Sequence, residues 1–141
     1  MANTTQRDEF LAARPRLAML TTLRADGSPI TVPVWYEWDG RDVSIFSSVS
    51  SPKLRRIERD PRVSILMAND VDEPEYWVAF EGDARVEADG GLELAERLAP
   101  SYWDLDDPER MAVLDEWRGL GSQGLCRIVV TPARIREFPT H

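Results

Sequence analysis

The sequence predicts a mainly β fold, a six-stranded antiparallel β-barrel with a few short flanking helices. Two Asp-Gly pairs, at residues 26–27 and 39–40, separate runs in which apolar and polar residues alternate. Asp-Gly favours the tight turns of β-hairpins, and alternation places one face of a strand in a core. Further alternating runs follow in the second half of the chain, and a closed barrel would leave no strand edge exposed.

The first half of the chain reads as a short helix followed by a three-stranded meander. We expect the helix at residues 4–14, ending before Pro15, because proline is a poor fit to helix interiors. Strands are expected at 16–24, 28–38 and 43–48, joined by the two Asp-Gly turns. In the first strand one face is formed by Ala18, Leu20, Thr22 and Arg24, and the other by Leu17, Met19, Thr21 and Leu23.

Pro33 stands inside the second expected strand, and proline has no N–H to donate to a neighbouring strand. The position is therefore at a sheet edge, at a bulge, or at a point where the backbone faces a ligand. The sequence favours the edge and leaves the other two interpretations open.

The second half continues the barrel and adds helices. Its expected elements are a helix at 51–59, strands at 62–69 and 75–87, helices at 92–99 and 107–118, and a last strand at 125–130 that resumes at 134–138. Pro100 and Pro108 are expected to separate the two later helices.

The composition is that of one soluble domain, expected to span residues 1–141. Hydrophobic residues make up 43% of the chain, and no stretch approaches the ~18 apolar residues that span a bilayer. The polar N-terminus lacks the apolar segment of a signal peptide, so a cytoplasmic location is the default expectation. A formal net charge of −8 argues against nucleic acid as a partner, and no membrane partner is expected.

Cysteine and histidine are too scarce for several kinds of site. Cys126 is the single cysteine and His141 the single histidine, at the end of the chain. A Cys/His zinc site and an ordered Ser-His-Asp triad are therefore excluded. Cys126 lies in an apolar run, and we expect it to be a small buried side chain rather than a nucleophile.

The segment around residues 47–59 is the one that points to ligand chemistry. Ser51 suits a helix N-cap and Pro52 the first helical position, and a helix N-terminus offers free N–H groups to an anion. Residues 50–60 have a charge balance of +2 in a chain of −8. Serine hydroxyls and cationic side chains together suit a phosphate, and this segment supplies both, through Ser47, Ser48, Ser51, Lys53, Arg55, Arg56 and Arg59. The alternative is a solvated basic helix with ordinary capping.

Acidic clusters give weaker signals. Residues Asp70, Asp72, Glu73 and Glu75 could form a metal site, but such groups are more often a solvated loop, and no metal is expected. The same holds for the cluster of Asp104, Asp106, Asp107 and Glu109, which also suits the start of a helix.

No pair of a nucleophile and a base is visible, so a bound cofactor would have to carry any reaction. Of the five tryptophans, Trp35 stands beside Pro33 and could border a planar ligand or be buried at an interface. A cofactor with a phosphate and a planar ring fits these observations.

Four segments together resemble one family, the pyridoxamine-phosphate-oxidase-like split β-barrels, also called flavin/deazaflavin oxidoreductases. Residues 17–29 resemble its first hairpin, and 32–36 the strand beside the cofactor ring. Residues 51–63 resemble its phosphate helix, and 76–84 its long strand with an aromatic–Glu–Gly–x–Ala pattern. Each motif is weak alone, whereas their order and spacing are fairly specific.

The resemblance implies a homodimer with the cofactor in a groove between the subunits. It places the cofactor ring near the backbone of Val32, Pro33, Val34 and Trp35. It places phosphate contacts at Ser47, Ser48, Lys53 and Arg56. The partner subunit would close the site, with Trp77 or the segment around Trp103.

The resemblance also implies a choice of cofactor. Pyridoxamine phosphate oxidases have an arginine on the second strand that helps to hold flavin mononucleotide (FMN), whereas residues 30–34 contain none. The chain also lacks their C-terminal substrate-binding extension, so pyridoxamine phosphate oxidation is not expected. The sequence resembles more closely the actinobacterial branch that uses the deazaflavin coenzyme F420, with FMN as the alternative.

The expected function is an F420-dependent oxidoreductase that passes hydride to or from an unsaturated small molecule such as a quinone or an enone. One alternative is a binding protein that stores a flavin, deazaflavin or tetrapyrrole without turnover. A dimeric interaction module without a cofactor is ranked last.

Overall fold

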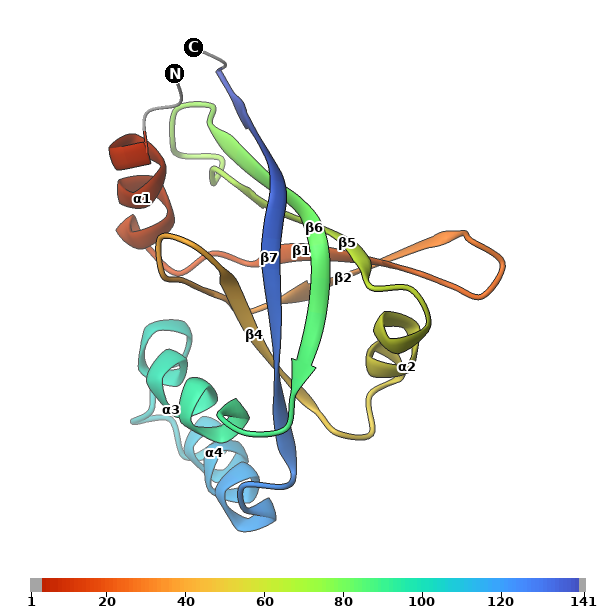
Figure 1. The fold of residues 1–141 in the computed structure, drawn as a ribbon. Helices are drawn as coiled ribbons and strands as arrows, with labels where there is room; N and C mark the ends of the chain where they lie inside the picture. Colours follow the sequence, from red (N-terminus) through yellow and green to blue (C-terminus); the bar gives the residue numbers. More distant parts are fainter. Residues whose placement is uncertain (1–3, 140–141) are drawn as a thin grey trace.

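A computed structural model describes residues 4–139 and shows a mainly β protein with four helices (Figure 1). Its elements are α1 (Thr4–Ala13), β1 (Ala18–Leu23), β2 (Pro29–Val34), β3 (Glu37–Trp38), β4 (Val43–Ser48), α2 (Pro52–Arg59), β5 (Arg62–Ala68), β6 (Trp77–Glu87), α3 (Gly91–Tyr102), α4 (Pro108–Leu120) and β7 (Leu125–Phe138).

The strands form one curled antiparallel sheet in the order β2-β1-β5-β6-β7-β4-β3. Residues 4–139 therefore contain seven strands rather than the six expected, and β2 and β3 are left as edges. The expected strand at 28–38 is divided because Trp35 and Tyr36 leave the ladder. The Tyr36 hydroxyl donates to the Leu11 carbonyl at 2.8 Å, and the Trp35 ring packs against other aromatic rings. The two edges of the sheet are thus joined by only two residues.

Both Asp-Gly pairs form the expected hairpin turns. Gly27 and Gly40 have φ angles of +85° and +91°, which residues with a Cβ rarely adopt. The Asp26 carboxylate accepts the Ser28 N–H at 2.9 Å and the Asp39 carboxylate accepts the Arg41 N–H at 2.8 Å. Local chemistry therefore fixes the register of both hairpins.

The last strand is continuous and contains a bulge where a break was expected. Glu81 pairs with Arg134 and Gly82 with Pro132, so Ala133 is an extra residue in the ladder between β6 and β7. A Cβ at Gly82 would lie 2.2 Å from the Thr131 carbonyl oxygen, so only glycine fits this close approach.

The helix α3 also differs from the expectation, because it continues through Pro100 to Tyr102. Pro100 is exposed, so water can solvate the carbonyl that lacks its usual donor. The Tyr102 ring is stacked on Trp35 at 4.7 Å, a contact that favours the last turn of the helix. In Figure 1, α3 and α4 lie together beside one end of β4 and β7, and α2 lies apart from them near β6.

The barrel interior follows the alternation of the strands. Ala18, Leu20 and Thr22 of β1 are buried, whereas Leu17 and Met19 are 52% and 38% exposed on the outer face. The largest fully buried side chains of the strands include Phe80, Ile45, Ile65, Met67, Val78, Ile128 and Val130.

Candidate functional site

The start of α2 lies where β4 ends, and its capping follows the sequence. Ser51 has an extended backbone, and its side chain accepts the Lys53 N–H at 3.4 Å. Pro52 begins the helix, and Leu54 and Ile57 are buried against the barrel. The N-cap, the first helical residue and the apolar anchor are therefore confirmed.

Three cations of α2 are held by hydrogen bonds to the barrel. The Lys53 amine donates to the Ser47 hydroxyl at 3.4 Å, and the Arg56 Nε donates to the Thr22 hydroxyl at 2.8 Å. One turn further on, Arg59 donates to the Leu23 carbonyl at 3.4 Å. We call the surface formed by Ser47, Ser48, Ser51, Lys53 and Arg56 the anion corner.

The cations of α2 have no carboxylate partner. Ion pairs within residues 4–139 engage ten of the arginines, but none of them includes Lys53, Arg55, Arg56 or Arg59. Burial lowers the pKa of the half-buried Lys53 amine, and the nearby Arg56 charge lowers it further. An anion at the corner would offset both effects.

Ser47 accepts a hydrogen bond from the Lys53 amine, and Cys126 in turn contacts Ser47. Ser47 is buried, and the Cys126 thiol donates to its carbonyl at 3.5 Å. Cys126 is itself buried, as expected, and burial raises the pKa of its thiol. The Ser48 hydroxyl instead shares a hydrogen bond with Ser50 at 2.9 Å.

Pro33 lies on an edge strand, so the favoured interpretation of its position is confirmed. β2 is an edge of the sheet and pairs with β1, with Pro33 opposite Met19 and Val32 opposite Leu20. Residues that exchange backbone hydrogen bonds with a partner strand alternate with residues that do not. Since Pro29 and Pro33 cannot donate, the backbone groups of alternate residues 29, 31 and 33 turn to the open edge.

The anion corner and the edge of β2 are neighbours in the sheet. Thr22, which contacts Arg56, pairs with Ile30 of β2 at about one strand spacing, ~4.8 Å. Pro33 lies three residues further along, or roughly 10 Å. Val32, Pro33 and Val34 are therefore placed within reach of a ligand whose anionic group occupies the corner.

The side chain of Trp35 belongs to an aromatic cluster of its own chain. Its ring is 4.7 Å from both Tyr102 and Trp103, and it also contacts Phe46 and Trp117. Trp35 and Trp103 thus fix α3 and α4 to the barrel, and the Trp35 backbone is the part beside the β2 edge.

Trp77 is not brought to the anion corner of the same subunit. It begins β6 and is stacked on Phe138 at 6.3 Å, whereas α2 approaches β6 near Ala84, whose N–H bonds the Pro61 carbonyl. Seven residues of strand, roughly 23 Å, separate Trp77 from Ala84.

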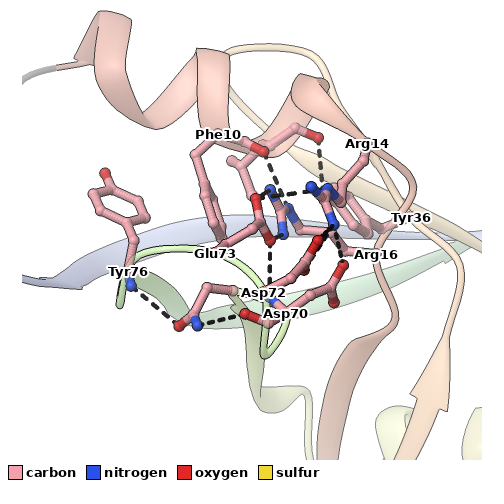
Figure 2. Close-up of polar contacts among 10 residues, drawn as sticks. Phe10, Arg14, Arg16, Tyr36, Asp70, Asp72, Glu73 and Tyr76 are labelled. Carbon is pink, nitrogen blue, oxygen red and sulfur yellow. Dashed lines mark hydrogen bonds and ion pairs between the residues drawn. The ribbon is translucent and has the colours of Figure 1, made fainter.

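The acidic loop before β6 is neutralised by arginines. Arg14 donates to Asp70 at 2.9 Å and to Asp72 at 3.2 Å, and Arg16 forms a two-point ion pair with Glu73 (Figure 2). Hydrogen bonds from Arg16 lower the pKa of Glu73 to about 2. These contacts tie the loop to the segment after α1.

The second acidic cluster includes Asp107, which caps α4 by accepting the Glu109 N–H at 3.0 Å.

Comparison with known proteins identifies the family. Residues 4–136 match the family described as pyridoxamine 5'-phosphate oxidase. The chain belongs to this family. Among its relatives is the F420H(2)-dependent biliverdin reductase of Mycobacterium tuberculosis (strain CDC 1551 / Oshkosh), 36% identical over 93 residues. The match covers 63% of this chain and 66% of the relative, slightly under two thirds of the relative's length.

Solved structures share the fold of the family. A protein named F420 reductase is 25% identical, with a TM-score of 0.71 over 91% of this chain and 94% of the other. A putative pyridoxamine 5'-phosphate oxidase from Listeria innocua is 18% identical, with a TM-score of 0.70 over 99% and 100% of the two chains. The likeness to the second protein is one of fold. Among residues 4–139, no helix is long and apolar enough to cross a membrane.

The anion corner fits the phosphate of a family cofactor. It combines a half-buried amine and a guanidinium that lack carboxylate partners. The expected free N–H groups are not found, because Pro52 has no N–H and those of Lys53 and Leu54 donate to the side chain and the carbonyl of Ser51. Thr22 was absent from the residues selected by sequence. No signal in the sequence marked it, because the opposite face of its strand, with Leu17, Met19 and Leu23, is the more apolar, and only the structure shows that Thr22 is buried.

Proposed function

We propose that the chain is an F420-dependent oxidoreductase that works as a homodimer and binds the cofactor phosphate at the anion corner. The observation that carries this proposal is the set of α2 cations that are fixed by hydrogen bonds yet lack carboxylates. The names of two relatives, an F420H(2)-dependent biliverdin reductase and an F420 reductase, support F420 as the cofactor.

The residues at the corner divide the work of holding a phosphate. Ser51 caps α2, since its side chain and its carbonyl accept the N–H groups of Lys53 and Leu54, and so fixes the start of the helix that bears the cations. Lys53 and Arg56 supply charge, and Arg56 can donate through two terminal nitrogens. At the end of β4, the buried Ser47 hydroxyl accepts from Lys53 and donates to the Ser48 carbonyl at 3.1 Å, so Ser47 holds the amine, and the exposed Ser48 hydroxyl would reach a phosphate by exchanging its bond to Ser50.

The open edge of β2 would hold the planar ring. Val32, Pro33, Val34 and the backbone of Trp35 present a flat surface, with carbonyl groups and few N–H donors at the edge. Reduced F420, when bound, supplies hydride to an unsaturated acceptor. The chain positions the ring and neutralises the phosphate. Because the corner offers cations and hydroxyls and no carboxylate among its described residues, we expect water to supply any proton.

The outer face of the sheet supports the homodimer. Pro33, Met19 and Leu66 form a row across three strands that is exposed at Pro33 and Met19, and Leu17 is 52% exposed beside it. Such an exposed apolar surface marks an interface in soluble proteins. Trp77 and Phe138 extend the same face, so each subunit can offer Trp77 to the site of its partner.

Two alternatives to an F420-dependent enzyme have specific support, namely FMN as the cofactor and storage of a cofactor without turnover. FMN also carries a phosphate that suits the corner, although residues 30–34 contain no arginine. Storage of a cofactor without turnover is favoured by the lack of a nearby acid or base. A module without any cofactor would leave the unpaired cations of α2 without a role.

Titration distinguishes these possibilities. Purified protein is titrated with F420 and with FMN, and binding is followed by fluorescence. We expect F420 to bind more tightly, and Lys53→Met to weaken binding about 10- to 100-fold, the usual effect of one charged hydrogen bond. Arg55→Met is the matched control, since Arg55 is exposed on the same helix and should leave affinity within about twofold.

Clear preference for FMN, or equal affinity of Lys53→Met and wild type, contradicts the proposal. Stopped-flow oxidation of bound reduced F420 by quinones, enones and a linear tetrapyrrole then separates catalysis from storage. Acceleration by an acceptor supports catalysis, and no acceleration by any of them supports storage.

A further inference from the structure

Thr22 is a polar residue in a buried row of β1. Its relative exposure is 2%, and the residues on the same face of the strand, Ala18 and Leu20, are fully buried. A buried hydroxyl is stable only with a hydrogen-bond partner. Within residues 4–139 the partner of this hydroxyl is the Arg56 Nε, at 2.8 Å.

The bond to Thr22 sets the direction of the Arg56 guanidinium. The group is planar, so a hydrogen bond at Nε restricts the rotation of the whole guanidinium plane. Arg56 is half-buried, and no hydrogen bond or ion pair within residues 4–139 engages its two terminal nitrogens. Both can therefore face a phosphate in the two-point geometry that arginine favours.

We infer that Thr22 is a positioning residue for the cofactor phosphate and acts through Arg56. This inference rests on the proposed function, because it needs an anion at the corner. In the free protein Thr22 holds the long Arg56 side chain near its binding geometry, so less conformational freedom is lost when the anion binds. Leu23, the next residue of β1, holds Arg59 through its carbonyl in a similar way.

Two substitutions separate positioning from packing. Thr22→Val keeps the shape of the side chain and removes the acceptor, whereas Thr22→Ser keeps the hydroxyl. Thr21→Val is the matched control, since Thr21 is the adjacent residue on the opposite face and its hydroxyl bonds Thr31 at 2.8 Å. Each variant is titrated with F420, with the phosphate-free deazaflavin chromophore and with inorganic phosphate.

We expect Thr22→Val to bind F420 and inorganic phosphate about tenfold more weakly, a loss typical of one hydrogen bond to a charged group. Its affinity for the phosphate-free chromophore should stay within about twofold. Thr22→Ser and Thr21→Val should resemble the wild type. On an Arg56→Met background, Thr22→Val should add no further loss, since the two residues act on one interaction.

A measurement without ligand checks the same geometry. In ¹⁵N NMR spectra the Arg56 Nε–H signal should exchange slowly with water in the wild type and quickly in Thr22→Val. The Arg55 side chain, which is exposed on the same helix, should exchange quickly in both proteins.

Three outcomes overturn the inference. They are equal phosphate affinity of Thr22→Val and wild type, an equal loss for the phosphate-free chromophore, and an additive loss on the Arg56→Met background. If wild type binds inorganic phosphate but not F420, the choice of cofactor fails while the role of Thr22 is still measured with phosphate. If wild type binds neither, both the proposed function and the inference are wrong.

Discussion

Lys53 is the residue at which charge and burial oppose each other most clearly. Burial and the Arg56 charge lower the pKa of its amine, while the Ser47 hydroxyl is its hydrogen-bond partner. In the folded protein without ligand the charged form is thus disfavoured relative to the unfolded chain. A bound phosphate reverses this balance, because the charged amine then has a counter-ion.

The affinity for phosphate should therefore depend on pH. Phosphate raises the lowered pKa of Lys53, so binding takes up a proton in the range between the free and bound values. Affinity is expected to be full below the pKa of the free protein and to fall as the pH rises through that range. Calorimetric titration with inorganic phosphate across the alkaline range measures the effect. Lys53→Arg, which stays protonated, should give a flat profile, and a slope that persists in this variant would assign the effect to another group.

Gly82 carries the clearest constraint at the level of a single element. Its close approach to the Thr131 carbonyl allows the bulge that fits Pro132 into the ladder between β6 and β7. Without this bulge the longest pair of strands in the sheet would lose its register.

Gly82→Ala should lower the free energy of unfolding by about 1–3 kcal/mol, the usual cost of forcing extra atoms into a packed site. Gly119→Ala is the control, because Gly119 lies in helix α4 and a Cβ at this position would have no atom within 4 Å. That change should stabilise by about 0.5–1 kcal/mol. Urea unfolding of the two variants gives both values, and a neutral Gly82→Ala would show that the bulge can relax.

Elements with local signals could be predicted from sequence, and elements set by distant contacts could not. The two hairpins and the cap of α2 follow from Asp-Gly pairs and from Ser51 with Pro52, all adjacent in the chain. The break after β2 depends on the packing of Trp35 against Tyr102, 67 positions later. The same limit explains why the extension of α3 beyond Pro100 was missed.

The residues of the anion corner also differ in whether their signal is local in the sequence. Lys53 and the serines could be selected because a helix start and a cluster of cations are visible in one short segment. The contact of Thr22 with Arg56 joins two elements, 34 residues apart, and no pattern in the sequence showed that the face of β1 with Thr22 is the buried one. The ion pairs of Arg14 and Arg16 with the acidic loop were hidden for the same reason.

For the whole molecule, the apolar outer face predicts how subunits associate. Leu17→Glu places a charge on that face at a side chain that is already half exposed, so the subunit itself should stay folded. We expect light scattering after gel filtration to show monomers for Leu17→Glu and dimers for wild type. F420 affinity should fall in parallel, because the proposed site is completed by a second subunit.

Val71→Glu is the control for this experiment, since Val71 is fully exposed in the loop before β6. It should remain dimeric and bind F420 as wild type does. A Leu17→Glu protein that stays dimeric would place the interface on another face.

The ion pair between Arg7 of α1 and Glu137 of β7, at 3.0 Å, has a practical consequence. It holds the first helix and the last strand together, so both ends of the described chain emerge on one side, away from α2 (Figure 1). Affinity tags, fluorescent labels or surface tethers joined to either end would project from that side. The α2 helix, with the anion corner of the same subunit, would lie away from the point of attachment.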